Sequence, residues 1–380
     1  MKKILFAFDS FKGSLTSIEV GEAASRGAKK VFPQVETVVV PVADGGEGTV
    51  EAVVGATGGE IVTAVVTGPL GDKVEAAYGI SGDTAIIEMA AASGLPLVPP
   101  QKRNPWITTS RGTGELIRDA IARGCRKFLI GIGGSATNDA GTGMLRALGF
   151  RFLDKEGTDV AEGGGATGRI AFIDTSEVLP QLAECSFTVA CDVTNPLTGP
   201  SGASHVFGPQ KGADTAMTEA LDRSLASFAR VVEELKGTDL STYPGAGAAG
   251  GLGFAFLAFL EATLEPGVEM VLEAIGFDRC LTDADLAFTG EGRLDTQTPM
   301  GKTPAGVLRH CRRFGVPVIA VGGSLQPDAV QLLEETGFAA VFPVIPAPMS
   351  LSEALMPDVA AANVERTVEQ ILRTLKLGKN

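Results

Sequence analysis

The chain has 380 residues, of which 44% are hydrophobic and 20% are charged, a composition typical of a globular protein that buries a full core. Its length favours about two or three domains. The 45 acidic residues outnumber the 32 basic residues, which leaves a net charge of −13. The basic stripe of a nucleic-acid-binding protein and the polybasic run of a membrane-surface protein are both absent, so we expect small-molecule partners.

The N-terminus begins with two lysines and a short apolar run, Ile4 to Phe8, that Asp9 ends. This run is too short for the apolar part of a signal peptide, so we interpret it as a first β-strand. No stretch approaches the ~20 apolar residues that cross a membrane. The five scattered cysteines include no CxxC pair and indicate free thiols. We therefore predict a cytoplasmic protein.

The first part of the chain alternates strands and helices. Ile4–Phe8 is followed by a capping box, Thr16 with Glu19, that predicts a helix ending before Pro33. A second strand is expected over Val38–Val42 and a second helix from about Thr49. Residues 61–89 contain short strand-like runs separated by Gly and Asp turns, which predict an antiparallel patch.

Helix and strand alternation resumes at Gly112–Arg123 and Lys127–Ile132, and the apolar spacing over 216–236 predicts an amphipathic helix. Near the C-terminus we expect strands at Leu286–Thr289, Val316–Val321 and Ala340–Ile345, and helices at Thr303–Phe314, 327–336 and Val359–Leu375. The predicted fold is α/β with two α/β domains. Residues 1–68 and 284–380 would form one doubly wound, mostly parallel sheet of the flavodoxin or Rossmann type, and residues 69–283 an inserted mixed α/β domain.

Glycine-rich loops follow most of the predicted strands. Because ligands of open α/β sheets bind beyond the carboxyl ends of the strands, and glycine lets backbone N–H groups approach an anion, these loops are the candidate phosphate and substrate sites. Their residues are Ser10, Lys12, Gly13, Ser14, Asp44, Gly45, Gly46, Gly133, Gly134, Ser135, Thr137, Asn138, Asp192, Gly290, Glu291, Arg293, Asp295 and Lys302.

The charged residues of these loops suit phosphoryl transfer. That reaction needs positioned cations, usually with Mg²⁺ held by carboxylates, and a group that orients the attacking hydroxyl. The candidate cations are Lys12, Lys211, Arg293 and Lys302, and the candidate carboxylates are Asp9, Asp44, Asp192 and Asp295.

Other nucleotide and hydrolase patterns compete with this interpretation. Gly301-Lys302-Thr303 ends like a Walker A motif, but Thr296 stands where its first glycine is required. Gly131 to Ala136 matches GxGxxA and is followed by Asp154, so a dinucleotide-dependent oxidoreductase is the alternative. A hydrolase triad is disfavoured because only two histidines exist, and His310 is expected to be solvated on a helix.

The ordered motifs of this chain resemble the bacterial-type class I glycerate kinase family almost from end to end. The matching stretches are 9–14, 43–49, 131–139, 191–193 with 195–197, 206–213, 245–251, and 289–295 with 301–302. The resemblance implies ATP and Mg²⁺ dependence, D-glycerate as the acceptor, 2-phosphoglycerate as the product and an active site in a cleft between two α/β domains. The residues alone leave attack by the 2-hydroxyl or the 3-hydroxyl open.

Within this framework we assign hypothetical roles. Lys12 and Arg293 hold the substrate carboxylate and the transferred phosphate, and the backbone of Gly133, Gly134 and Ser135 faces the ATP phosphates. Asp192 and Asp295 are the candidates for binding Mg²⁺ and for orienting the glycerate hydroxyl. The oligomeric state stays open, and a homo-oligomer fits the sequence.

Overall fold

The computed structural model describes residues 1–377, which divide into two compact units. Unit 1 comprises Met1–Asp44, Glu51–Thr57 and the chain from Val268 onward, and unit 2 comprises Gly45–Val50 and Gly58–Gly267. These boundaries differ from the predicted ones, because residues 58–68 contribute a strand to the sheet of unit 2 and residues 268–283 form helices of unit 1.

Unit 1 is built on a five-stranded sheet with the order β15-β13-β11-β1-β2, in which all neighbours are parallel. Its strands are β1 (Lys3–Phe8), β2 (Glu36–Pro41), β11 (Leu286–Gly290), β13 (Val318–Gly322) and β15 (Ala340–Pro343). Read from β2, this is the 2-1-3-4-5 order of the flavodoxin type, so the predicted doubly wound sheet is confirmed.

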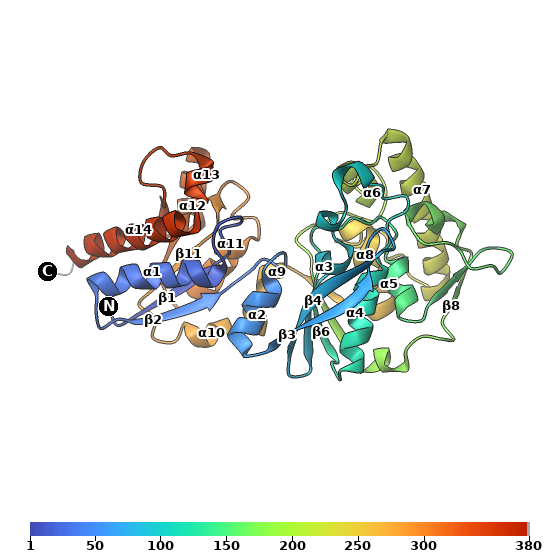
Figure 1. The fold of residues 1–380 in the computed structure, drawn as a ribbon, viewed down its shortest axis with the longest axis horizontal. Coiled ribbons are helices and arrows are strands. Elements are labelled where there is room, and N and C mark those ends of the chain that lie inside the picture. Colours follow the sequence, from blue (N-terminus) through green and yellow to red (C-terminus); the bar gives the residue numbers. More distant parts are fainter. Residues whose placement is uncertain (378–380) are drawn as a thin grey trace. The chain divides into compact units, whose positions relative to one another are not determined.

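Helices cover both faces of this sheet (Figure 1). Ile4, Phe6 and Phe8 point to the face where α1 (Ser17–Val31) and α14 (Pro357–Leu377) pack. Because side chains alternate along a strand, Leu5 and Ala7 point to the opposite face, which α11 (Thr303–Arg313) contacts. The predicted capping box of Thr16 and Glu19 is present at the start of α1.

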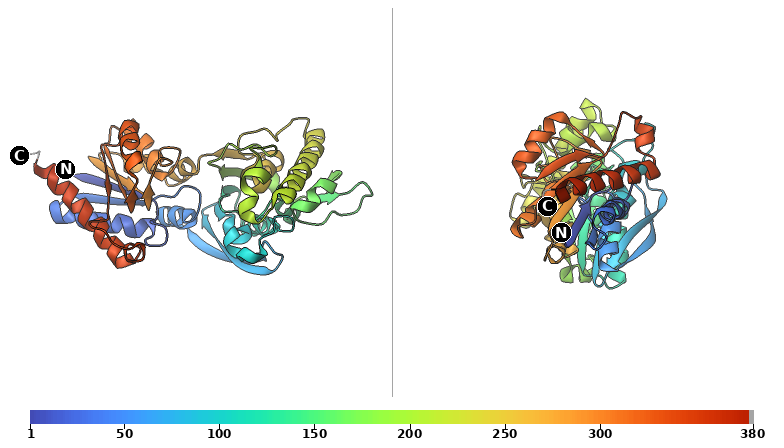
Figure 2. Two further views of the ribbon diagram at one scale, coloured as in Figure 1. Left: turned by 90° about the horizontal axis from the view of Figure 1, so that it is seen from above. Right: turned by 90° about the vertical axis from the view of Figure 1, so that its left-hand side faces the viewer.

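The remaining elements of unit 1 are shorter. They are α2 (Thr49–Thr57), which begins in unit 2, α9 (Gly267–Ala274), α10 (Phe277–Cys280), α12 (Pro327–Thr336), α13 (Leu351–Ala354), and the strand pair β12 (Arg293–Leu294) with β14 (Ser324–Leu325). Figure 2 shows α14 running alongside α1. Their close approach needs Gly27, where a Cβ atom would lie 2.3 Å from the carbonyl oxygen of Glu365.

One expectation about unit 1 is wrong. His310 is not solvated, because only 7% of it is exposed and both ring nitrogens lie against carboxylates. Nε2 lies 3.0 Å from Glu269 Oε2 and Nδ1 lies 2.5 Å from Asp278 Oδ1. The arginines beside His310 in the sequence suggested a solvated helix face, but α9 and α10 cover this side of α11.

Unit 2 contains a six-stranded mixed sheet in the order β10-β9-β6-β5-β4-β3. The strands are β3 (Glu60–Thr67), β4 (Lys73–Ser81), β5 (Thr84–Glu88), β6 (Lys127–Gly131), β9 (Ser186–Ala190) and β10 (Thr263–Glu265). The predicted antiparallel patch is confirmed, since β3 pairs with β4 and β4 with β5 in that orientation, whereas β5, β6, β9 and β10 are parallel.

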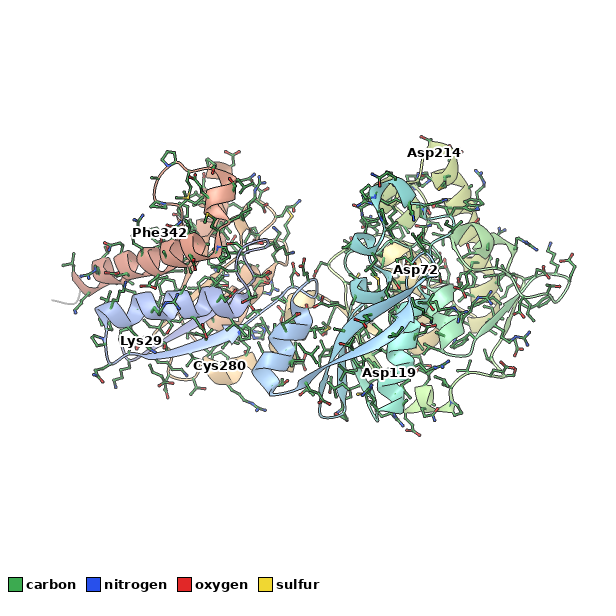
Figure 3. The ribbon with its side chains drawn as sticks, viewed as in Figure 1. Lys29, Asp72, Asp119, Asp214, Cys280 and Phe342 are labelled. Atoms are coloured by element: carbon green, nitrogen blue, oxygen red, sulfur yellow. The ribbon has the colours of Figure 1, made fainter. Side chains whose placement is uncertain are left out.

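The helices of unit 2 pack around a separate core. They are α3 (Ala90–Ser93), α4 (Arg111–Ala122), α5 (Thr142–Ala147), α6 (Ala203–Phe207), α7 (Thr215–Lys236) and α8 (Ala248–Leu260). In addition, β7 (Arg151–Leu153) pairs antiparallel with β8 (Phe172–Asp174) in a separate two-stranded sheet. Tyr78 of β4 is completely buried and donates a 2.6 Å hydrogen bond to Asp119 of α4, which is labelled in Figure 3.

Candidate active site

Unit 1 carries a pocket of about 580 Å³ at the carboxyl ends of its strands. The loops after β1 and β11 form one part of its lining. These two strands are neighbours whose connections leave in opposite directions along the sheet, and such a switch point is where open α/β sheets bind ligands. Most of the predicted site residues of unit 1 line this pocket: Ser10, Lys12, Ser14, Asp44, Glu291, Arg293, Asp295 and Lys302.

Asp9, the first residue after β1, lies at the base of this pocket with only 4% of it exposed. Its carboxylate accepts hydrogen bonds from the backbone N–H of Ser10 (2.7 Å) and from Thr303 Oγ1 (3.0 Å). Burial, with the nearby Asp44 carboxylate, raises the pKa of Asp9 to about 7. Lys12 is exposed and forms no ion pair within residues 1–377.

The loop after β11 is held by its own polar contacts. Lys302 Nζ lies 3.4 Å from both Glu291 Oε2 and Asp295 Oδ1, and Thr298 donates a 2.7 Å hydrogen bond to Glu291. Burial raises the pKa of Glu291, whereas hydrogen bonding and nearby cations lower the pKa of Asp295 despite its desolvation. The Arg293 side chain is 60% exposed and lies 3.9 Å from the Asp295 carboxylate.

Gly290 and Gly13 were also predicted as site residues, but neither of them lines the pocket. A Cβ atom on Gly290 would lie 1.8 Å from the Val321 carbonyl oxygen, so this position requires glycine for strand packing. Gly13 has a φ of +77° and open space around it, so it allows the loop to turn.

In unit 2, glycine-rich segments meet at the carboxyl ends of β6 and β9. A Cβ atom on Gly131 would lie 2.1 Å from the Gly45 carbonyl oxygen, and one on Gly45 would lie 2.4 Å from Ala190 Cβ. Gly46 lies beside Gly133, and the Asp192 carboxylate accepts a 3.0 Å hydrogen bond from the N–H of Gly267. These contacts bring together segments that are far apart in the sequence.

The loop after β6 presents its backbone to solvent at only two positions. Gly133 and Gly134 are exposed, whereas Ser135, Thr137 and Asn138 are buried. The side chain of Asn138 donates a 3.0 Å hydrogen bond to Ser204 Oγ. Within the described part of the chain, Thr137 Oγ1 and Asn138 Oδ1 have no hydrogen-bond partner. The exposed glycines therefore offer the face on which an anion can approach.

Lys211 supports this loop from inside unit 2. Its ammonium group donates hydrogen bonds to Ser135 Oγ (2.6 Å) and to the Thr137 carbonyl oxygen (2.7 Å), and only 1% of the residue is exposed. Burial lowers the pKa of Lys211 to about 7, although the Asp139 carboxylate favours the charged form. Its predicted role in binding phosphate remains a hypothesis, but the contacts in the structure are to the loop itself.

The structure gives no support to the dinucleotide interpretation. A dinucleotide fingerprint opens a helix directly, but β6 ends at Gly131 and α5 begins only at Thr142. Asp154 does not follow a strand of the main sheet. It caps a turn by accepting hydrogen bonds from the N–H groups of Glu156 and Thr158.

Several lining residues were not predicted from the sequence. Val344, Ile345, Leu351, Leu355 and Asn363 line the unit 1 pocket. They come from the loop after β15, from α13 and from α14, where no glycine-rich motif marks them. Asp9 and Asp139 stood inside recognised motifs, and their burial is the feature that only the structure shows.

The acidic residues of the pocket suit Mg²⁺ delivered with a nucleotide. Residues 1–377 contain no group of three or more His, Cys, Asp or Glu side chains placed to hold a metal ion by themselves. Mg²⁺ commonly uses only one or two carboxylates together with substrate phosphates, and the carboxylates of Asp44, Glu291 and Asp295 line the pocket. Asp192, the other predicted ligand, belongs to unit 2.

Known proteins resemble this chain over its whole length. The model of the glycerate kinase family matches residues 4–376. A glycerate kinase of Bacillus subtilis is 50% identical over 99% of this chain and 98% of its own, and a glycerate 2-kinase of Escherichia coli is 49% identical with the same coverage. A crystal structure described as a glycerate kinase 2 from Salmonella typhimurium LT2 matches with a TM-score of 0.91 and 49% identity, covering 100% of this chain and 99% of that one. None of the helices within residues 1–377 is long and apolar enough to span a membrane.

Proposed function

Because the chain belongs to the glycerate kinase family, we propose that it transfers the γ-phosphoryl group of ATP to a hydroxyl group of D-glycerate. The observation that carries this proposal is the match to glycerate kinases at about half identity across nearly the full length of both chains. We favour 2-phosphoglycerate as the product, since the relative from Escherichia coli, which is 49% identical to this chain, is a glycerate 2-kinase. The cytoplasmic location and the sharing of one active site by the two units stay predictions.

The charged groups of the unit 1 pocket support this reaction. Lys12 and Arg293 are exposed cations at the switch point, and we propose that they contact the transferred phosphate. Lys302 lies between two carboxylates and fixes their positions. Asp295, with Asp192 as the second candidate, would hold Mg²⁺, which when bound neutralises charge that develops on the phosphate oxygens.

A proton must leave the attacking hydroxyl during transfer. Asp9 is suited to accept it, because a general base works best when its pKa is close to the operating pH and the pKa of Asp9 is about 7. Asp192 and Asp295 remain the candidates for orienting the hydroxyl. The exposed N–H groups of Gly133 and Gly134 suit a second anionic group.

The proposal is tested by ³¹P NMR of the protein with ATP, Mg²⁺ and D-glycerate. We expect the ATP signals to be replaced by those of ADP and 2-phosphoglycerate. Appearance of 3-phosphoglycerate would correct the product only. If ATP is not consumed although glycerate binds, the protein is a sugar-acid-binding protein and the proposal is wrong.

A further inference from the structure

The unit 1 pocket has a charged part and an apolar part. The loops after β1 and β11 contribute Lys12, Arg293 and Lys302. The segment 344–363, which contains α13 and the start of α14, contributes the aliphatic side chains of Val344, Ile345, Leu351, Ala354, Leu355 and Ala360. Leu351 is 74% exposed, so its side chain is accessible to a ligand in the pocket. A ligand that uses the whole pocket needs both an anionic group and an apolar surface.

One amide interrupts the apolar part. Asn363 lies on the inward face of α14, beside the core residues Ala360 and Val364, and only 9% of it is exposed. It lines the pocket, and its side chain forms no hydrogen bond with any residue of the described chain. Its polar atoms are not sealed from solvent but open into the pocket, where a polar ligand group can pair with them.

We infer that the segment 344–363 binds the base of the nucleotide, with the Asn363 amide hydrogen-bonded to the edge of the base. This inference rests on the proposed use of ATP. D-Glycerate is a small acid with polar groups on every carbon, and it could neither fill about 580 Å³ nor use an aliphatic wall. A nucleotide has the flat base that packs on Val344, Ile345 and Leu351, and the amide of Asn363 can both donate to and accept from it.

The same arrangement orients the rest of the nucleotide. With the base on segment 344–363, the phosphates extend toward Lys12, Arg293 and Lys302 within the same pocket of unit 1. This differs from the sequence-based hypothesis, in which Gly133 to Ser135 bind the ATP phosphates. The two assignments differ in which substrate loses affinity when the same residue is replaced.

The experiment measures ADP binding by isothermal titration calorimetry on the full chain with Mg²⁺ and without glycerate, and steady-state KM values for both substrates. Asn363→Leu keeps the size of the side chain and removes the amide, and we expect it to weaken ADP binding by about 5- to 20-fold. Leu351→Glu places a negative charge at an exposed position and should weaken it similarly. Gln370→Ala, which removes an exposed amide from the same helix, is the matched control and should leave the ADP affinity unchanged.

The KM for glycerate should change less than twofold in both variants. Because the Asn363 side chain forms no hydrogen bond with the described chain, the melting temperature of Asn363→Leu should stay close to that of the parent, whereas replacing a structural asparagine would lower it. Unchanged ADP affinity in both variants would overturn the inference, as would a loss confined to glycerate. If Asn363→Leu fails to fold, Leu351→Glu decides alone. A parent protein that binds ADP but phosphorylates nothing would refute the proposed function and leave the base site standing.

Discussion

Replacing Lys211 with methionine removes the ammonium group buried in unit 2 while it keeps an unbranched side chain of similar length. In the unfolded chain a lysine has a pKa near 10.5, whereas burial lowers the pKa of Lys211 in the folded protein to about 7. Between these two pH values the unfolded state therefore binds more protons than the folded state. The contribution of Lys211 to stability consequently rises as the pH increases from about 7 toward 10.5.

The size of this effect follows from the two pKa values. Because proton binding by Lys211 is linked to folding, the free energy of unfolding should rise by about 2 kcal/mol from pH 7.5 to pH 9.0. Each pH unit contributes at most about 1.4 kcal/mol. The parent protein should show this increment. Lys211→Met has no group that titrates at this position, so the difference in stability between parent and variant should move in favour of the parent by about that amount.

The single tryptophan makes the measurement specific. Trp106 belongs to unit 2, so its fluorescence during urea unfolding follows the unit that contains Lys211. Parent and variant are compared at several pH values, with Lys155→Met, which removes an exposed lysine of the same unit, as the control. A stability difference between parent and Lys211→Met that stays constant from pH 7.5 to 9.0 would refute the argument that burial controls this ammonium group.

Three further variants test the pocket and the loops. Lys12→Ala should lower kcat by ~10²–10³ with folding intact, because Lys12 is exposed and makes no ion pair within the described chain, and a parent-like kcat/KM would remove Lys12 from the site. Asp9→Asn should abolish most activity yet stabilise unit 1 by up to about 4 kcal/mol at pH 8. The folded pKa of about 7 exceeds the unfolded value of 3.8, so ionisation of Asp9 opposes folding as the pH rises from 3.8 to 7, at about 1.4 kcal/mol per pH unit. Thermal unfolding at pH 5 and pH 8 checks the sign. Gly290→Ala should lower the free energy of unfolding by about 3 kcal/mol or more, since its Cβ atom would clash with the Val321 carbonyl oxygen at 1.8 Å. Gly133→Ala should fold normally and lose substrate affinity, because the nearest neighbour of its Cβ atom is Gly46 Cα at 3.9 Å. Urea denaturation and substrate KM values separate these two glycine outcomes.

Local patterns predicted the elements of this protein well. The continuous apolar run at Ile4–Phe8, the capping box at Thr16 and the periodic apolar positions of 216–236 each reflect interactions within a few residues, and the structure has β1, α1 and α7 there. The glycine-rich loops were found because glycine after a strand lets backbone N–H groups approach an anion, a property that is visible in the sequence. The ordered motifs also sufficed to identify the family.

Packing between distant segments decided the properties of the site. Lys211, His310 and Asn363 look like ordinary polar residues in the sequence, and each is buried only because helices or loops from elsewhere in the chain cover it. The pKa of Asp9 depends in the same way on burial and on Asp44, which follows a different strand. The sequence by itself determined which segments become strands, helices and anion-binding loops, since those choices depend on neighbouring residues. Tertiary structure alone decided which polar groups lose water and which side chains share a pocket, because desolvation and proximity arise only when remote segments pack together.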